Sequence, residues 1–141
     1  RQRQMCIRDR QDVIGLDLPM SRRNRGALDN GQDIALHTFP AHMAPLGMAF
    51  YQSGNLPTKY NHSLFIAFHG SWNRSVPAGY KVVRVVLNEQ GKIIRHEDFI
   101  TGWLRPNGDK VGRPVDLELS PSGDLYLSDD MSGVVYLIKK R

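Results

Sequence analysis

Residues 63–87 read SLFIAFHGSWNRSVPAGYKVVRVVL, and this stretch decides the fold. Two short runs rich in aromatic and β-branched residues flank a polar loop that contains glycine and proline. Runs of this length and composition, bounded by turn-forming residues, are typical of β-strands rather than of helices. The stretch therefore predicts strands over 64–68 and 80–87, joined by the loop HGSWNRSVPAG.

Further strand candidates of the same kind lie on both sides of this stretch. Apolar and small residues alternate over 46–50, and residues 92–100 form a candidate downstream. The pattern then restarts with candidates at 115–119, 125–127 and 134–138, divided by the turns PSGD and DDMSG. We expect one four-stranded antiparallel sheet over residues 44–100 and most of a second over residues 115–138.

The two predicted sheets repeat one sequence pattern. Residues 63–66 match residues 124–127, and the offset from Leu64 to Leu125 is 61 residues. This offset is long for a propeller blade but is compatible with loop insertions. The fold class we predict is all-β, a β-propeller fragment of about two four-stranded blades. Because propellers have about four to eight blades, we expect the rest of the ring to lie outside this sequence. The alternative is a small sandwich of seven strands.

Charge and hydropathy exclude two classes of function. The net charge is +5, but the first ten residues hold four arginines and one aspartate, a balance of +3. The remainder has 15 Lys and Arg against 13 Asp and Glu, which leaves only +2. A nucleic-acid-binding domain concentrates basic residues on a folded surface, so we expect no nucleic-acid partner. No apolar run approaches about eighteen residues, so we expect no membrane span.

The first ten residues, RQRQMCIRDR, have no apolar periodicity and resemble a translated sequencing adapter. We expect residues 1–10 to be a non-native segment and exclude them from the fold. The only cysteine, Cys6, lies in this segment. Residues 11–141 are then expected to be the C-terminal blades of a propeller.

Polar residues gather in the loops that a meander would bring to one end. In antiparallel strands, alternate loops share an end, which groups the loops 39–45, 69–79, 105–114 and 129–133. We call these four loops the polar end. They contain His42, His69, Trp72, Asn73, Arg74, Arg113, Asp129 and Asp130. Because arginine's planar fork binds carboxylates and stacks on rings, this set could bind an anionic planar molecule or a sugar.

The motif His69-Gly70-Ser71-Trp72-Asn73-Arg74, followed by Gly79-Tyr80-Lys81-Val82, resembles the signature of the sugar dehydrogenases that use pyrroloquinoline quinone (PQQ). The resemblance is strongest to the sorbosone and aldose-sugar dehydrogenases and extends over roughly residues 37–138. The motifs APLG, GWL, GRPVD and SDD follow in that family's order. This sequence has Val111 where the family often has tryptophan, and Phe68 where it often has an acidic residue.

The resemblance implies a six-bladed propeller with PQQ across one end and calcium supporting it. The family oxidises an aldose or sugar aldehyde, with a histidine base and hydride transfer to PQQ. That base is expected upstream, so this segment would supply part of the cofactor-pocket wall. A periplasmic or secreted location is also implied, while the electron acceptor is left open. The alternatives are a non-catalytic sugar-binding or scaffold propeller and a propeller lactonase.

Five residues are the predicted cofactor-binding residues: Arg113, Arg74, Asn73, His69 and His42. Arg113 is the first candidate for a PQQ carboxylate, since it opens an inner strand at the polar end. The alternative is that this arginine only fixes its loop. Trp72 is interpreted as a packing wedge between blades. No metal ligand is assigned, because Asp129 and Asp130 precede a Ser-Gly turn and are more typical of turn caps.

Overall fold

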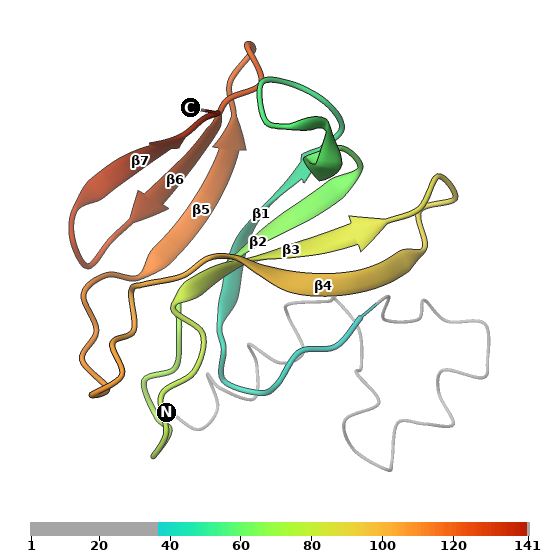
Figure 1. Cartoon of the computed structure of the whole chain (residues 1–141). Helices are drawn as coiled ribbons and strands as arrows, with labels where there is room; N and C mark the ends of the chain where they lie inside the picture. Colours follow the sequence, from blue (N-terminus) through green and yellow to red (C-terminus); the bar gives the residue numbers. More distant parts are fainter. Residues whose placement is uncertain (1–36, 141) are drawn as a thin grey trace, which may run out of the picture.

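The computed structural model describes residues 37–140, which form two antiparallel β-sheets (Figure 1). The first sheet consists, in order, of β1(Pro45–Tyr51), β2(Ser63–Phe68), β3(Lys81–Leu87) and β4(Ile93–Ile100). The second consists, in order, of β5(Pro114–Leu119), β6(Leu125–Asp129) and β7(Val134–Ile138). The expected non-native segment 1–10 lies outside the described residues.

The predicted all-β fold is confirmed. Each sheet is a meander in chain order, and β1 and β5, the first strands of the two sheets, pack against each other. The helical structure in the described range is one short 3-10 helix, η2(Thr58–Tyr60). Two meanders with their first strands side by side are successive blades of a β-propeller, and not the halves of a sandwich.

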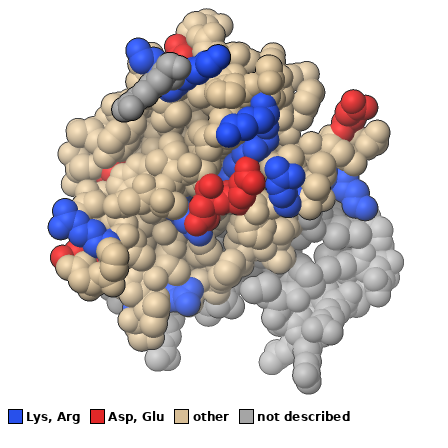
Figure 2. All heavy atoms as spheres, viewed as in Figure 1, with Lys and Arg blue, Asp and Glu red and all other residues tan. Residues whose placement is uncertain are grey.

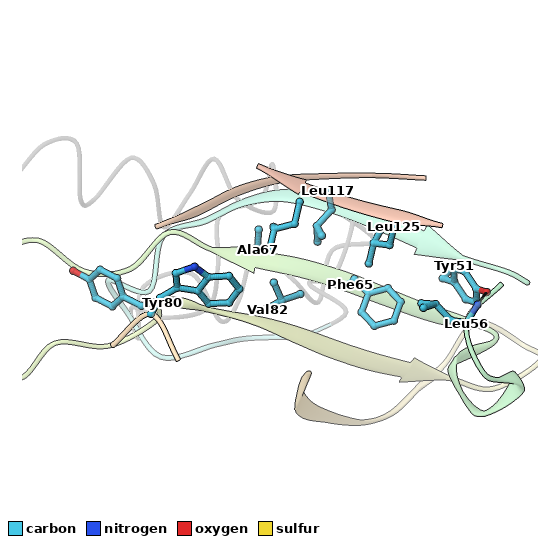
Figure 3. Packing of buried hydrophobic residues seen from close by; sticks show 10 residues of the cluster. Tyr51, Leu56, Phe65, Ala67, Tyr80, Val82, Leu117 and Leu125 are labelled. Atoms are coloured by element: carbon cyan, nitrogen blue, oxygen red, sulfur yellow. Dashed lines mark hydrogen bonds between the residues drawn. The ribbon is translucent and has the colours of Figure 1, made fainter. Parts of the chain in front are cut away.

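The main hydrophobic core lies between the two sheets. Tyr51, Phe65 and Val82 of the first sheet meet Leu117 and Leu125 of the second, and all are at most 2% exposed (Figure 3). A second cluster on the other face of the first sheet contains Met43, Ile66, Phe68, Val83 and Val85. Strands β2 and β3 are therefore buried on both faces, which explains their continuous apolar sequences.

The small residues of β1 face the second sheet. Leu46, Met48 and Phe50 are each about half exposed, whereas Tyr51 is fully buried. At Gly47, an added Cβ atom would lie 2.5 Å from Asp116 Cα and 2.8 Å from the Val115 carbonyl oxygen. Large half-exposed residues and small residues therefore alternate along β1. At Gly47 the backbones of β1 and β5 approach each other so closely that only glycine fits.

A buried arginine fixes the end opposite the polar end. Arg84, on β3, is 4% exposed and donates from Nε to Ser63 Oγ at 2.8 Å and from Nη2 to the Lys59 carbonyl. Its Nη1 donates to Glu97 Oε1 at 2.8 Å. The hydrogen bonds from Arg84, and then from Arg95, hold the pKa of Glu97 below its ordinary value. Figure 2 shows acidic and basic side chains next to one another near the middle of the face in view.

We predict that Gly47→Ala destabilises the chain by about 2–3 kcal/mol, because the added methyl group overlaps backbone atoms that no rotamer change can move. Met48→Ala, at the adjacent half-exposed position, is the matched control and should change stability by less than about 1 kcal/mol. Urea unfolding of the full chain measures both. Equal free energies of unfolding for the two variants would show that β1 and β5 do not approach closely.

A second stability prediction concerns Arg84. Arg84→Met should cost about 2–4 kcal/mol, since it leaves the buried Ser63 hydroxyl and the Lys59 carbonyl without a donor. Arg95→Met also removes a contact with Glu97, of 3.3 Å, but Arg95 is exposed, so the expected loss is below about 0.5 kcal/mol. Thermal or urea unfolding compares the two variants, and a loss for Arg95→Met as large as that for Arg84→Met would contradict the buried network.

Candidate functional site

The four loops of the polar end lie together, as the sequence predicts. Figure 1 shows the β2–β3 loop, the β4–β5 connection and the β6–β7 turn at the same end of the two sheets, with the segment before β1. The β2–β3 loop is tied to that segment by two backbone hydrogen bonds, His69 N to Ala44 O at 2.9 Å and Gly70 N to Met43 O at 3.0 Å. The polar end is therefore one continuous surface built from both sheets.

Arg113 joins the two sheets at this end. Its Nε donates to the His69 carbonyl at 3.2 Å and its Nη2 to the Gly70 carbonyl at 2.9 Å. The guanidinium carbon also lies 5.5 Å from the centroid of the Tyr80 ring, a cation–π distance. Arg113 thus fixes the 69–79 loop against the second sheet. Its Nη1 has no acceptor among residues 37–140, so both N–H groups of this nitrogen are available to another group.

Asp129 holds the backbone beneath Arg113. This carboxylate is 3% exposed, and its Oδ1 accepts hydrogen bonds from Arg113 N at 2.9 Å and Ser132 N at 3.0 Å. Burial raises the pKa of Asp129, but hydrogen bonds from Arg113, Ser132 and Met131 outweigh it, and the pKa lies below its ordinary value. Asp129 is therefore a turn cap, as its sequence position suggested. Its Oδ2 is buried without a partner in the described part of the chain.

A histidine and an aspartate pair across the two sheets. His69 Nε2 lies 3.0 Å from Asp130 Oδ1 and 3.1 Å from Oδ2. The His69 side chain is 17% exposed and that of Asp130 is 60% exposed, so the pair sits at the rim of the polar end. The carboxylate orients the imidazole, which leaves Nδ1 as the ring nitrogen available to another group.

The tip of the 69–79 loop is exposed. Ser71 N donates to Ala78 O at 2.8 Å, and Ala78 N donates to Ser71 Oγ at 2.9 Å, which closes the base of the loop. Beyond this closure, Trp72, Asn73 and Arg74 are exposed. Trp72 is 48% exposed, so it does not pack between the two described sheets, and its role as a wedge between blades stays a prediction.

The five predicted site residues fall into two groups. His69 and Arg113 share the junction between the sheets. Arg74 reaches back to the segment before β1, where its Nη1 donates to Ala41 O at 3.1 Å, next to the partly buried His42. Asn73 makes no hydrogen bond within the described range. The structure thus brings all five to one end without placing them in a single contact cluster.

Two residues of this end, Tyr80 and Lys110, were given no site role by the sequence. Tyr80 is 1% exposed, and its hydroxyl donates to the Ser71 carbonyl. Lys110 Nζ lies 5.7 Å from the centroid of the Tyr80 ring. Tyr80 also has a positive φ of 55°, which costs a non-glycine residue about 1–2 kcal/mol. The signal for Tyr80 was its place in the motif Gly79-Tyr80-Lys81-Val82, at the start of a strand candidate.

Residues 37–140 contain neither a metal cluster nor a membrane-spanning helix. No group of three or more His, Cys, Asp and Glu side chains is placed to hold a metal ion there. None of the helical structure in this range has the length and apolar character needed to cross a membrane.

Residues 29–141 match the model of one protein family, described as TrAA12-like. The chain is 39% identical over 105 residues to an uncharacterized protein of Borreliella burgdorferi, a match that covers 74% of this chain and 28% of that protein. It is 36% identical over 122 residues to the pyrroloquinoline quinone-dependent pyranose dehydrogenase of Coprinopsis cinerea, covering 72% of this chain and 16% of the enzyme. The chain therefore spans about a sixth to a quarter of the curated relatives that it matches.

Solved structures agree with this assignment. The holo form of the C. cinerea pyranose dehydrogenase PQQ domain matches with a TM-score of 0.54 at 34% identity, over 72% of this chain and 28% of that domain. A Trichoderma reesei structure of Carbohydrate-Active Enzymes Family AA12 matches with a TM-score of 0.55 at 26% identity. This match covers 69% of the present chain and 25% of the T. reesei protein chain. With a family match over most of its length and these folds, the chain belongs to the TrAA12-like family.

Proposed function

We propose that this chain is part of a quinoprotein sugar dehydrogenase, which oxidises an aldose or sugar aldehyde by hydride transfer to PQQ. In this proposal the polar end supplies part of the wall of the cofactor pocket and not the catalytic base. Similarity to a PQQ-dependent pyranose dehydrogenase supports the activity class. The observation that carries the proposal is the collection of cations without carboxylate partners at the polar end.

Cations in the loops of the polar end lack acidic partners. On the strands, Lys81 pairs with Asp98 at 2.6 Å, and the buried Arg84 pairs with Glu97. At the polar end, Arg74, Lys110 and Arg113 have no Asp or Glu oxygen within ion-pair distance in the described chain. Such unneutralised donors fit an anionic ligand with several carboxylates, such as PQQ.

Each predicted residue has a distinct task in this proposal. Arg113 would offer Nη1 and the second N–H of Nη2 to a carboxylate, since its remaining N–H groups are held by backbone carbonyls. Arg74 and Asn73, on the exposed loop tip, would bind a second edge of the ligand. His69, oriented by Asp130, and His42 would donate or accept hydrogen bonds at the rim. When bound, PQQ supplies the quinone that accepts the hydride from the sugar.

The remaining parts of the proposal concern the whole protein. A six-bladed ring, a calcium ion held mainly by residues beyond 37–140, and a histidine base in another blade are expected from the family. A periplasmic or secreted location belongs to the same proposal. The sorbosone-type and aldose-type substrates both remain candidates for the sugar.

The proposal predicts selective loss of PQQ binding from the polar end. Residues 37–140 would replace the aligned segment of the C. cinerea PQQ domain, and the resulting apo-protein would be titrated with PQQ in excess calcium. We expect Arg113→Ala to weaken reconstitution about thirty-fold or more, because truncating a shielded charged partner costs about 2–4 kcal/mol. Arg74→Ala should cost the same or somewhat less. Dye-linked sugar oxidation reports the reconstituted fraction.

Lys59→Ala is the matched control, since Lys59 is an exposed cation at the opposite end. It should leave the titration unchanged. Because Arg113 also joins the sheets, thermal unfolding of each apo-variant separates lost binding from lost folding. If Arg74→Ala and Lys59→Ala titrate alike in folded protein, the polar end does not hold the cofactor. Binding of sugar without PQQ-dependent oxidation would instead favour a non-catalytic sugar-binding or scaffold propeller.

A further inference from the structure

We infer that Tyr80 is a positioning residue, which holds Arg113 and the 69–79 loop in the arrangement that receives the anionic ligand. This inference rests on the proposed function and goes beyond it, because Tyr80 is buried and would touch no ligand itself. Its side chain contacts parts of the polar end that come from different segments of the chain.

The first contact is with the loop. The Tyr80 hydroxyl donates to the Ser71 carbonyl, directly before the exposed tip that starts at Trp72. The ring also packs against Gly70, where an added Cβ would lie 2.5 Å from Tyr80 Cδ2. Gly70 must therefore be glycine, because any side chain there would overlap the ring. The ring in turn supports the loop at this position.

The second contact is with the cations. The guanidinium carbon of Arg113 lies 5.5 Å, and Lys110 Nζ 5.7 Å, from the centroid of the Tyr80 ring. Arg113 comes from the start of the second sheet, and its Nε and Nη2 bind the carbonyls of His69 and Gly70. The ring and the carbonyls together fix the direction in which the free Nη1 points.

The third observation is the backbone conformation. Tyr80 has φ 55° and follows Gly79, whose φ is 90°. A Cβ on Gly79 would lie 2.7 Å from Gly70 Cα and 2.8 Å from Met43 O. The left-handed region is unfavourable for a bulky aromatic residue, and Gly79 beside it is packed against two other segments. We therefore infer that this backbone conformation is retained because it places the Tyr80 side chain under the loop.

The chain offers a matched control for Tyr80. Tyr51 is also fully buried in the same core, and its hydroxyl accepts one hydrogen bond from a backbone N–H, that of Leu56 at 2.9 Å. Figure 3 shows Tyr80 at one end of the cluster and Tyr51 with Leu56 at the other. The variants Tyr80→Phe and Tyr51→Phe therefore each remove one buried hydroxyl, but only one of them lies at the polar end.

The hybrid, in which residues 37–140 replace the aligned segment of the C. cinerea PQQ domain, is titrated with PQQ. Binding is followed by quenching of tryptophan fluorescence, and Trp72 lies on the exposed loop tip. Tyr80→Phe should weaken binding roughly fivefold, and Tyr80→Leu, which also removes the ring, roughly thirty-fold. Tyr51→Phe should lower stability by a similar amount to Tyr80→Phe and leave PQQ binding unchanged. Amide hydrogen exchange of the ligand-free chain should rise at Ser71 and Ala78 only in the Tyr80 variants.

A double-mutant cycle separates positioning from general stability. If Tyr80 acts through Arg113, Tyr80→Leu should weaken binding less than about threefold in an Arg113→Ala background. Additive effects would overturn the inference, as would equal binding by Tyr80→Phe and Tyr51→Phe in a chain that binds PQQ. Failure of the folded hybrid without substitutions to bind PQQ overturns the proposed function and, with it, this inference.

Discussion

The close approach of β1 and β5 at Gly47 is the constraint on which the rest of the structure depends. Without a side chain at this position, the first strands of the two sheets come within contact of each other's backbones. A second approach between Gly54 and Gly123, with Asn55 N donating to Gly123 O at 3.3 Å, holds the opposite end. The sheets are thereby locked at a fixed distance, and the polar loops of both sheets must meet.

This geometry gives Arg113 two tasks. Two of its nitrogens donate to carbonyls of the first sheet, which makes the residue a joint between blades. These bonds use two of the five guanidinium N–H groups, so in the proposed pocket the N–H groups of Nη1 and the second N–H of Nη2 remain for a carboxylate. The contact would be well directed, because the guanidinium is immobilised before the ligand arrives.

The sheets and the polar end could be predicted from the sequence, but the way they are joined could not. Bursts of aromatic and β-branched residues located the strands, because strand formation depends on local composition and turn residues. Gly47, Arg84 and Tyr80 lie in predicted strands, but no local pattern indicated which residues they contact. Their importance comes from contacts with Asp116, Lys59 and Arg113, which lie far away in the chain or across a loop. Position in the chain suggested a wedge for Trp72, yet the loop closes beneath it and leaves it exposed.

The two ends of the molecule differ in how their buried polar groups are satisfied. At the end of Arg84, buried charge is neutralised by Glu97 and the hydrogen bonds are satisfied within the chain, so this end contributes to stability. At the polar end, the buried Asp129 keeps an unpartnered oxygen, and Arg74, Arg105, Lys110 and Arg113 have no carboxylate within ion-pair distance in residues 37–140. The buried oxygen costs stability, and in the proposed function this cost falls where a ligand binds. The contact at Gly47 supports such an arrangement, because it sets the distance between the sheets in addition to the contacts that Arg113 and His69 make in the polar loops.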